Sequence, residues 1–230
     1  MIVKIIIPCW PDFKSAAQPC LRESLLNFAG EACLIELDKG IGNGYGFKYE
    51  GITFNIFASE YCYLSTARNL GANSFSGLIK IHQKICDSDR IQFIDADTGF
   101  TNTDILALID ENVPVIGGGY KYRMGVQKGK FVAGYWDELG LIKSIVDSNE
   151  TGITKVDWVG AGFLLVKSSV FEKIKYPWFH CGVIEKNDEA YELGEDIAFC
   201  RKCSNEGIQI LVHCGLNLTH RDLKNRSDKL

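Results

Sequence analysis

The amino-acid sequence predicts an α/β fold, and two observations support this prediction. In the first half of the chain, short apolar runs suited to strands alternate with segments in which apolar residues recur at helical spacing. Between residues 117 and 157 the sequence is rich in glycine and hairpin-like, which suggests antiparallel strands. The expected architecture is therefore a half of alternating strands and helices followed by a mixed half.

In the first half, local sequence features predict each helix, strand and loop. The first strand ends at Pro8, and Leu21, Leu25 and Phe28 share one face of the first helix. Glycine at every second position of GIGNGYGF predicts a turn-rich hairpin loop within 39–50, without the spacing of a dinucleotide-binding loop. The expected strands cover residues 1–7, 33–37, 52–57, 91–94 and 113–116, and the expected helices cover residues 14–28, 64–86 and 103–110.

The second half continues with fewer, shorter elements. A buried strand is expected at 159–166, and a short helix at 168–173 follows it. A helix at 195–206 and a strand at 208–212 precede a polar tail that starts at Cys214.

Length and composition are those of a single globular domain over residues 1–230. Apolar residues make up 46% of the 230 positions and charged residues 23%, which is ordinary for a protein with one substantial core. The net charge of −4 argues against holding nucleic acid through a diffuse positive field. A local basic patch is nevertheless present at Lys121, Arg123, Lys128 and Lys130.

The apolar runs, the N-terminal segment and the cysteines all bear on the cellular compartment of the protein. No apolar run approaches the roughly 20 residues that span a bilayer, and the N-terminal MIVKIIIPCW is predicted to be a strand rather than a signal peptide. The nine cysteines are odd in number and lack a framework spacing, so reduced thiols are expected. We therefore expect a soluble, cytoplasmic protein.

Two aspartates follow the apolar strand in RIQFIDADTGF, residues 90–100. Asp95 and Asp97 are two positions apart, so both side chains can face one way at the carboxyl end of the strand, where open α/β sheets bind ligands. Two close carboxylates repel each other unless a cation is near, and Mg²⁺ or Mn²⁺ prefers such oxygen ligands. The structural alternative is a solvated turn that Asp97 caps.

Four motifs in order give the chain a resemblance to a known family. FIDADTGF is preceded by STARNLGA and followed by VDWVGAGFLLVKSSVFEKI and GEDIAFCRKCSNEG. With these motifs the chain resembles the GT-A-fold nucleotide-sugar glycosyltransferases, in the broad family-two-like group, over most of its length. The resemblance implies a GT-A-like (Rossmann-like) mixed, mainly parallel central sheet flanked by helices. It also implies a nucleotide-sugar-binding half at 1–116, and an acceptor-binding half with the tail at 117–230.

The resemblance further implies a role for each motif residue. Asp97 and Asp95 would form the metal site, with Asp97 as the direct ligand and Asp95 also contacting ribose or sugar. His220 would complete the metal shell. The donor would also be bound by Pro8, Cys9, Trp10, Arg68, Asn69 and Ala96. The wall on the acceptor side would be formed by Trp158, Gly160, Ala161 and Gly162. Glu195 and Asp196 look like the acidic pair that opens a helix under the acceptor.

The implied reaction moves a hexosyl or pentosyl group from a nucleotide diphosphate sugar, with UDP-sugars favoured, to an acceptor hydroxyl. Mn²⁺ or Mg²⁺ and Arg68 would stabilise charge on the leaving phosphate. Asp196 would accept the hydroxyl proton in an inverting reaction, whereas a retaining one needs no such base. The acceptor is left open between a sugar, a lipid-linked glycan, a protein and a hydroxylated nucleic-acid base. Residues 117–190, the tail 221–230 or a partner would recognise it.

Two other functions remain open at this point. A metal-dependent nucleotidyltransferase could hold two metal ions with Asp95 and Asp97, but it leaves Glu195, Asp196 and His220 without a role. A zinc-stabilised binding module is the other alternative. Its ligands would come from the CxxC of Cys200 and Cys203 together with His180, Cys181, His213 and Cys214. Cysteines within a helical pattern are ordinarily buried thiols that act as small hydrophobic side chains.

Overall fold

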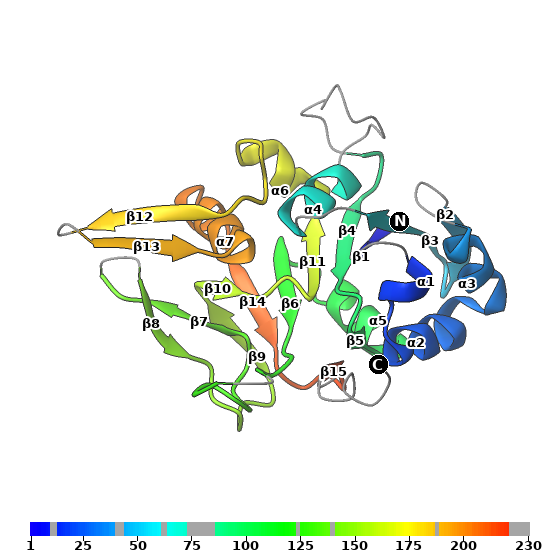
Figure 1. Cartoon of the computed structure of the whole chain (residues 1–230), viewed down its shortest axis with the longest axis horizontal. Coiled ribbons are helices and arrows are strands. Elements are labelled where there is room, and N and C mark those ends of the chain that lie inside the picture. Colours follow the sequence, from blue (N-terminus) through cyan, green and yellow to red (C-terminus); the bar gives the residue numbers. More distant parts are fainter. Residues whose placement is uncertain are drawn as a thin grey trace, which may run out of the picture.

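A computed structural model describes residues 1–9, 13–39, 44–60, 64–72, 86–122, 125–138, 141–186 and 189–220. Within these ranges the dominant feature is a mixed eight-stranded sheet (Figure 1). Its strands are, in spatial order, β2 (Gly44–Tyr49), β3 (Ile52–Glu60), β1 (Ile2–Cys9), β4 (Arg90–Ile94), β11 (Phe163–Lys167), β6 (Val115–Gly118), β14 (Ile210–His213) and β9 (Ile153–Val156).

Five of these strands run in the same direction, which places their carboxyl ends at one edge of the sheet. β1 is parallel to β3 and to β4. β11 is antiparallel to both β4 and β6, so β6 runs in the direction of β4, and β14 is parallel to β6. Ligands of open α/β sheets bind at the carboxyl ends of parallel strands, so this edge is the expected place for a site.

Helices cover both faces of the sheet, because its strands are apolar on both sides. In β1, Ile5 and Ile7 belong to one core and Ile6 to the other, as the alternation of a strand requires. The first core packs against α1 (Phe13–Ala16), α2 (Pro19–Ala29), α3 (Glu31–Asp38) and α5 (Asn102–Asp110). The second core packs against α4 (Leu64–Ala72), α6 (Ser168–Lys173) and α7 (Glu195–Asn205). The result is a three-layer α/β/α arrangement.

Three smaller sheets complete the described fold. β7 (Ala133–Trp136) lies between β10 (Trp158–Val159) and β8 (Ile142–Ile145). β12 (Gly182–Lys186) and β13 (Glu189–Leu193) form a hairpin that extends away from the central sheet on the left of Figure 1. β15 (Thr219–His220) pairs with β5 (Thr98–Gly99), at the same sheet edge as the ends of β4 and β14.

Several expected elements need correction. Residues 33–37, predicted as a strand, lie in α3, where Cys33 and Leu37 are buried four positions apart on one helical face. The loop predicted at 39–50 is strand β2 from Gly44 onward, because its half-buried aromatic residues alternate with the glycines. The predicted strand 159–166 is divided between β10 and β11 by a turn at 160–162.

Other boundaries differ in smaller ways. The predicted helix 14–28 is divided into α1 and α2, since Pro19 starts a new helix at its first turn. The helix predicted at 64–86 is confirmed as far as Ala72, and the part at 73–85 lies outside the described residues. The hairpin of β12 and β13 was not predicted. Within the described ranges, no helix combines the length and the apolar character needed to cross a membrane.

Candidate functional site

The two aspartates lie where the sequence predicts them, at the carboxyl edge of the sheet. Asp95 follows the last residue of β4, and Asp97 lies in the turn that leads to β5. The backbone N–H of Thr98 donates to the Asp95 carbonyl at 3.0 Å, and that of Asp95 donates to the Gly162 carbonyl at 2.9 Å. Both side chains are about three-quarters buried, with 25% and 23% of the Asp95 and Asp97 side chains exposed. The turn thus presents two fixed carboxylates to the edge.

Arg68 is the central cation of the site and is 1% exposed. Its Nη2 donates to Asp95 Oδ1 at 2.7 Å, and its Nη1 donates to Glu195 Oε1. The guanidinium carbon also lies 5.8 Å from the centre of the Phe179 ring. Arg68 therefore ties together α4, the end of β4 and the start of α7. This placement favours a positioning role rather than the direct contact with a diphosphate that the motif implies.

Glu195 and Asp196 open α7, where the helix dipole favours acidic residues. Burial raises the pKa of Asp196 above its ordinary value, and the neighbouring Glu195 carboxylate raises it further, while Arg68 opposes both effects. Asp196 therefore keeps its proton to a higher pH than an exposed aspartate. A carboxylate with a raised pKa is a stronger base once it is ionised.

His220 is brought to Asp97 by the pairing of β15 with β5, in which His220 lies opposite Thr98. Its Nδ1 lies 3.2 Å from the carbonyl oxygen of Lys121. Because a carbonyl can only accept a hydrogen bond, Nδ1 carries the hydrogen. In the neutral ring, Nε2 then presents its lone pair towards Asp97 Oδ1, at 3.6 Å. Backbone oxygens orient metal-binding histidines in the same way.

The close approach of β15 to β5 depends on Gly99. A Cβ atom at this position would lie 2.3 Å from Thr219 Oγ1 and 3.0 Å from Cys20 Cβ. Asp104, at the start of α5, holds the same segment from the other side, because its Oδ1 accepts from the backbone N–H of Asn217 at 2.9 Å. These two contacts place His220.

Asp97 and His220 fit a divalent ion of the Mn²⁺ type. Adjacent ligands of an octahedral ion are about 3 Å apart, and a small movement brings the 3.6 Å pair to that spacing. Carboxylate oxygen suits Mg²⁺ and Mn²⁺, and imidazole nitrogen suits transition metals. Among the described residues, no group of three or more His, Cys, Asp or Glu side chains is placed to hold a metal. A phosphate ligand and water would therefore have to complete the shell.

Tyr120, which sequence analysis did not select, lies at the centre of this edge. It follows β6, it is 7% exposed, and its hydroxyl accepts from the Gly162 N–H at 3.2 Å. Its ring centre is 5.0 Å from that of His220. Burial, followed by the charge of Asp95, raises its pKa well above the usual value, so the phenol stays protonated. Its position just beyond an apolar strand was the available signal.

The glycines at 160 and 162 make room for Tyr120. A Cβ atom on Gly162 would lie 2.9 Å from the Tyr120 ring and 3.1 Å from Asp95 Oδ2, and one on Gly160 would lie 2.2 Å from the Tyr120 hydroxyl. The neighbouring Ala161 and Trp158 are each 1% exposed, so both belong to the core beneath this turn. Of the expected acceptor wall, Gly162 thus lies next to the Asp95 carboxylate.

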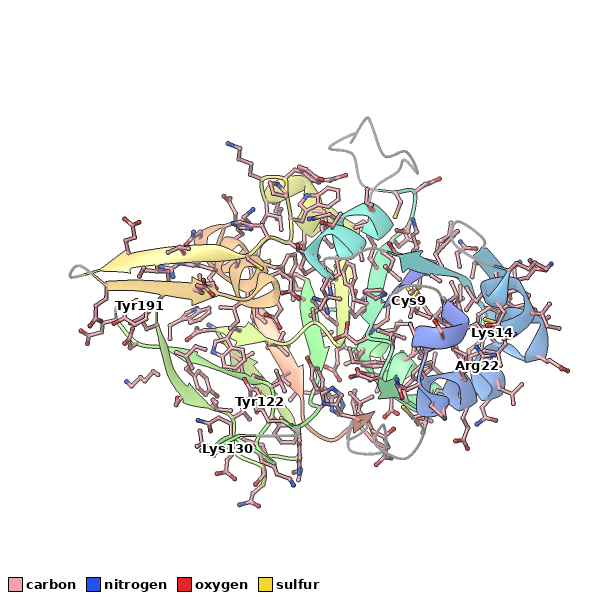
Figure 2. All side chains as sticks on the ribbon, in the orientation of Figure 1. Cys9, Lys14, Arg22, Tyr122, Lys130 and Tyr191 are labelled. Atoms are coloured by element: carbon pink, nitrogen blue, oxygen red, sulfur yellow. The ribbon has the colours of Figure 1, made fainter. Side chains whose placement is uncertain are left out.

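The other residues expected to bind the nucleotide sugar lie at the carboxyl edge of the sheet or beneath it. Pro8 and Cys9 are buried at the end of β1, where Figure 2 labels Cys9. Trp10 lies outside the described residues. Ala96 is half-buried between the aspartates. The Asn69 side chain donates to the Phe179 carbonyl at 2.6 Å and accepts from the Phe179 N–H at 2.9 Å, so it fastens a loop instead of facing the edge.

The cysteines expected of a zinc module are not gathered with histidines in the described part of the chain. Cys200 and Cys203 are buried on α7, and Cys200 Sγ contacts the backbone N and O of Val159 at 3.5 Å each. Burial raises the pKa of Cys203 to about 12. A protonated, buried thiol acts as a small hydrophobe rather than a ligand.

Comparison with known proteins finds similar structures but no similar sequences. No known family model matches the sequence, and no curated protein matches it. Among solved structures, A197 from STIV, a GT-A-like viral protein, matches with a TM-score of 0.55 and 17% identity, over 96% of this chain and 86% of that chain. The fold is of the GT-A type.

Two named glycosyltransferases are also similar, more distantly. The catalytic domain of Drosophila beta1,4galactosyltransferase 7, in complex with xylobiose, has a TM-score of 0.47 and 15% identity, over 98% of this chain and 73% of that chain. GalNAc-T7, solved with UDP, GalNAc and Mn²⁺, has a TM-score of 0.45 and 15% identity, over 96% of this chain and 44% of that chain. At these identities the likeness concerns the fold alone.

Proposed function

We propose that the protein is a metal-dependent glycosyltransferase that uses a nucleotide diphosphate sugar, with a UDP-sugar favoured. One observation carries the proposal. Chain segments far apart in sequence bring Asp95, Asp97, Glu195, Asp196 and His220 together at the carboxyl edge of a GT-A-type sheet. This edge is where such sheets bind ligands.

In this proposal Asp97 and His220 hold Mn²⁺ or Mg²⁺ with the donor diphosphate. When bound, the ion stabilises negative charge on the leaving phosphate. Arg68 keeps Asp95 turned towards α4, at 2.7 Å, so Asp97 is left to face His220. A two-metal nucleotidyl transfer would need both aspartates as ligands, and the Arg68–Asp95 pair opposes that alternative.

Asp196 is proposed as the base that accepts the proton of the acceptor hydroxyl in an inverting reaction. Its raised pKa suits this task, and its place at the start of α7 is fixed through the Glu195–Arg68 pair. The acceptor hydroxyl would lie next to Asp196, at the start of α7.

The experiment measures the release of nucleoside diphosphate from a panel of nucleotide sugars with Mn²⁺, with water as the hydroxyl that receives the sugar. We expect turnover with one of them. Asp196→Asn should be slower by about 10²- to 10⁴-fold, the range for loss of a general base, without a change in donor affinity. Equal turnover by Asp196→Asn would exclude the inverting role, and no turnover or binding of any nucleotide sugar would exclude the function.

The pH dependence of the same reaction tests the base more directly. The ionised carboxylate is the active form, so kcat/KM should fall as the pH is lowered through the raised pKa of Asp196. We expect this fall to begin above about pH 4, the ordinary aspartate value. A profile that stays flat down to about pH 4 would contradict the assignment.

We also propose that the protein works in a reducing compartment, as in the cytoplasm. This proposal is supported by buried, protonated thiols: burial raises the pKa of Cys33 and of Cys203 to about 12.

A further inference from the structure

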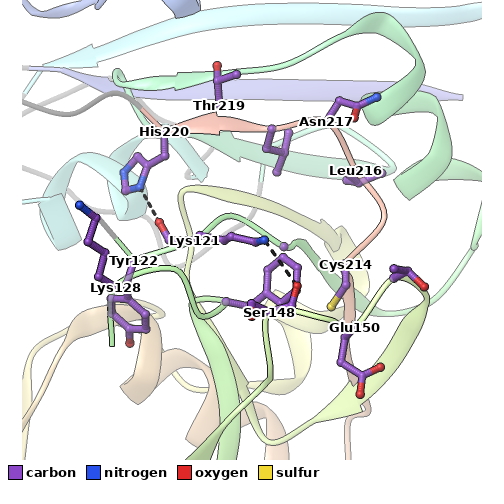
Figure 3. A pocket seen from close by; sticks show the side chains of 14 residues that line it. Lys121, Tyr122, Lys128, Ser148, Glu150, Cys214, Leu216, Asn217, Thr219 and His220 are labelled. Atoms are coloured by element: carbon purple, nitrogen blue, oxygen red, sulfur yellow. Dashed lines mark hydrogen bonds between the residues drawn. The ribbon is translucent and has the colours of Figure 1, made fainter. Parts of the chain in front are cut away.

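A hollow of about 720 Å³ lies beside His220 (Figure 3). Its volume is within the range of small-molecule sites. The connection after β6, the segment before β9 and the segment after β14 line it. Because His220 also faces Asp97, the hollow adjoins the proposed metal pair.

The hollow is lined by two lysines of the basic patch, Lys121 and Lys128, whose side chains the glycosyltransferase proposal does not use. Residues 118–136 contain four Lys or Arg and no Asp or Glu, in a chain whose net charge is −4. Among the described residues that line the hollow, the cations are Lys121 and Lys128 and the carboxylate is Glu150. The hollow thus has an excess of positive charge unlike that of the whole chain.

A hairpin presents these lysines. The backbone N–H of Tyr122 donates to the Lys130 carbonyl at 2.9 Å, and the N–H of Gly129 donates to the Tyr122 carbonyl at 3.0 Å. Tyr122 and Lys130 mark this hairpin at the lower left of Figure 2. Lys121 Nζ donates to the Ser148 carbonyl at 3.4 Å and lies 5.1 Å from the centre of the Phe131 ring. Both partners are uncharged, so the ammonium is held in place but its charge is not neutralised by them.

We propose that this hollow binds a phosphate group on the acceptor substrate, so that the acceptor is a small phosphorylated molecule such as a sugar phosphate. The inference rests on the proposed function. Ammonium groups fixed in a hollow form charge-assisted hydrogen bonds with phosphate oxygens. A long nucleic acid would instead need a row of cations along its backbone.

The hollow lies next to the proposed metal pair, but other segments of the chain line most of it. The donor carboxylates Asp95 and Asp97 follow β4, whereas the segments that follow β6 and β14 and the segment that precedes β9 line the hollow. Lys121 connects the two, since its side chain lies in the hollow while its carbonyl orients His220. An acceptor held there would place its other end at the metal pair.

Ligand-observed NMR titration tests the proposal with glucose 6-phosphate, glucose and inorganic phosphate as probes. Wild type is compared with the double variant Lys121→Met/Lys128→Met and with Lys130→Met. Lys130 is exposed on the same hairpin but does not line the hollow, so it is the matched control. The affinity of each protein for UDP with Mn²⁺ is measured in parallel.

We expect both phosphate-bearing probes to bind wild type, with affinity lowered at least about tenfold in the double variant and unchanged in Lys130→Met. UDP–Mn²⁺ affinity should be the same in all three proteins, because Lys121→Met keeps the backbone carbonyl that orients His220. The proposal is overturned if neither phosphate probe binds, if glucose binds as well as glucose 6-phosphate, or if Lys130→Met is equally weakened. Loss of UDP–Mn²⁺ binding in the double variant would assign the hollow to the donor instead. If wild type binds the phosphate probes but does not bind UDP with Mn²⁺, the glycosyltransferase proposal is refuted. The proposed phosphate site would then still stand.

Discussion

At the scale of single residues, the site depends on one buried arginine. Arg68 is 1% exposed and pairs with both Asp95 and Glu195. Removing one partner of a buried ion pair leaves uncompensated charge and costs several kcal/mol, much more than loss of an exposed pair. Arg68 was identifiable from the STARNLGA motif, but its partners were not, because they lie 27 and 127 positions away.

Arg68→Met should therefore lower the free energy of unfolding by about 3–5 kcal/mol, measured by urea denaturation. The matched control is Arg22→Met. Arg22 forms two hydrogen bonds with Asp38, but both side chains are about one-quarter exposed. Its loss should cost at most about 1 kcal/mol. Equal losses for the two variants would contradict the central role given to the Arg68 network.

At the scale of elements, the short pairing of β5 with β15 positions the metal pair. Only two residues on each strand take part, and Gly99 permits their approach. The family resemblance pointed to His220, yet neither strand was predicted, since two-residue strands lack a periodic pattern.

Gly99→Ala should separate β15 from β5, because its Cβ would meet Thr219 Oγ1 at 2.3 Å. We expect affinity for Mn²⁺ with UDP to fall about tenfold or more, since His220 moves away from Asp97. Gly152→Ala is the control, because a Cβ there meets nothing within 4 Å. Unchanged affinity in Gly99→Ala, measured by calorimetry, would show that His220 is not a ligand.

The elements also show how far the sequence could predict the fold. Strand β4 and helix α7 were predicted because apolar periodicity and acidic first-turn residues are local signals. Residues 33–37 were misassigned because a short apolar run has no distinguishing period. Tyr120 was missed because its role arises from packing between Gly162 and His220, which depends on strand order.

At the scale of the whole molecule, the reactivity of the thiols reports on the fold. Cys33, Cys200 and Cys203 are fully buried, and burial raises their pKa values, whereas Cys181 is exposed. The reactive form of cysteine is the thiolate. Accessible thiols should therefore react first.

Alkylation with iodoacetamide at about pH 8, followed by peptide mass spectrometry, checks this expectation. Cys181 should be modified in the native protein, and Cys33, Cys200 and Cys203 only after unfolding. Reducing agent should leave Tm unchanged. Modification of Cys200 in the native protein would mean that α7 is not packed as described, and a Tm lowered by reductant would contradict a reduced working state.

The central claim is that Asp97 and His220 form a metal-dependent site for a nucleotide diphosphate. The most direct measurement is calorimetric titration of UDP, with and without Mn²⁺, into wild type, Asp97→Asn and the control Asp110→Asn, whose side chain is exposed at the end of α5. We predict binding that requires Mn²⁺, is lost in Asp97→Asn and is retained in Asp110→Asn. UDP binding that is independent of Mn²⁺ or of Asp97, or no binding to wild type, would contradict the claim.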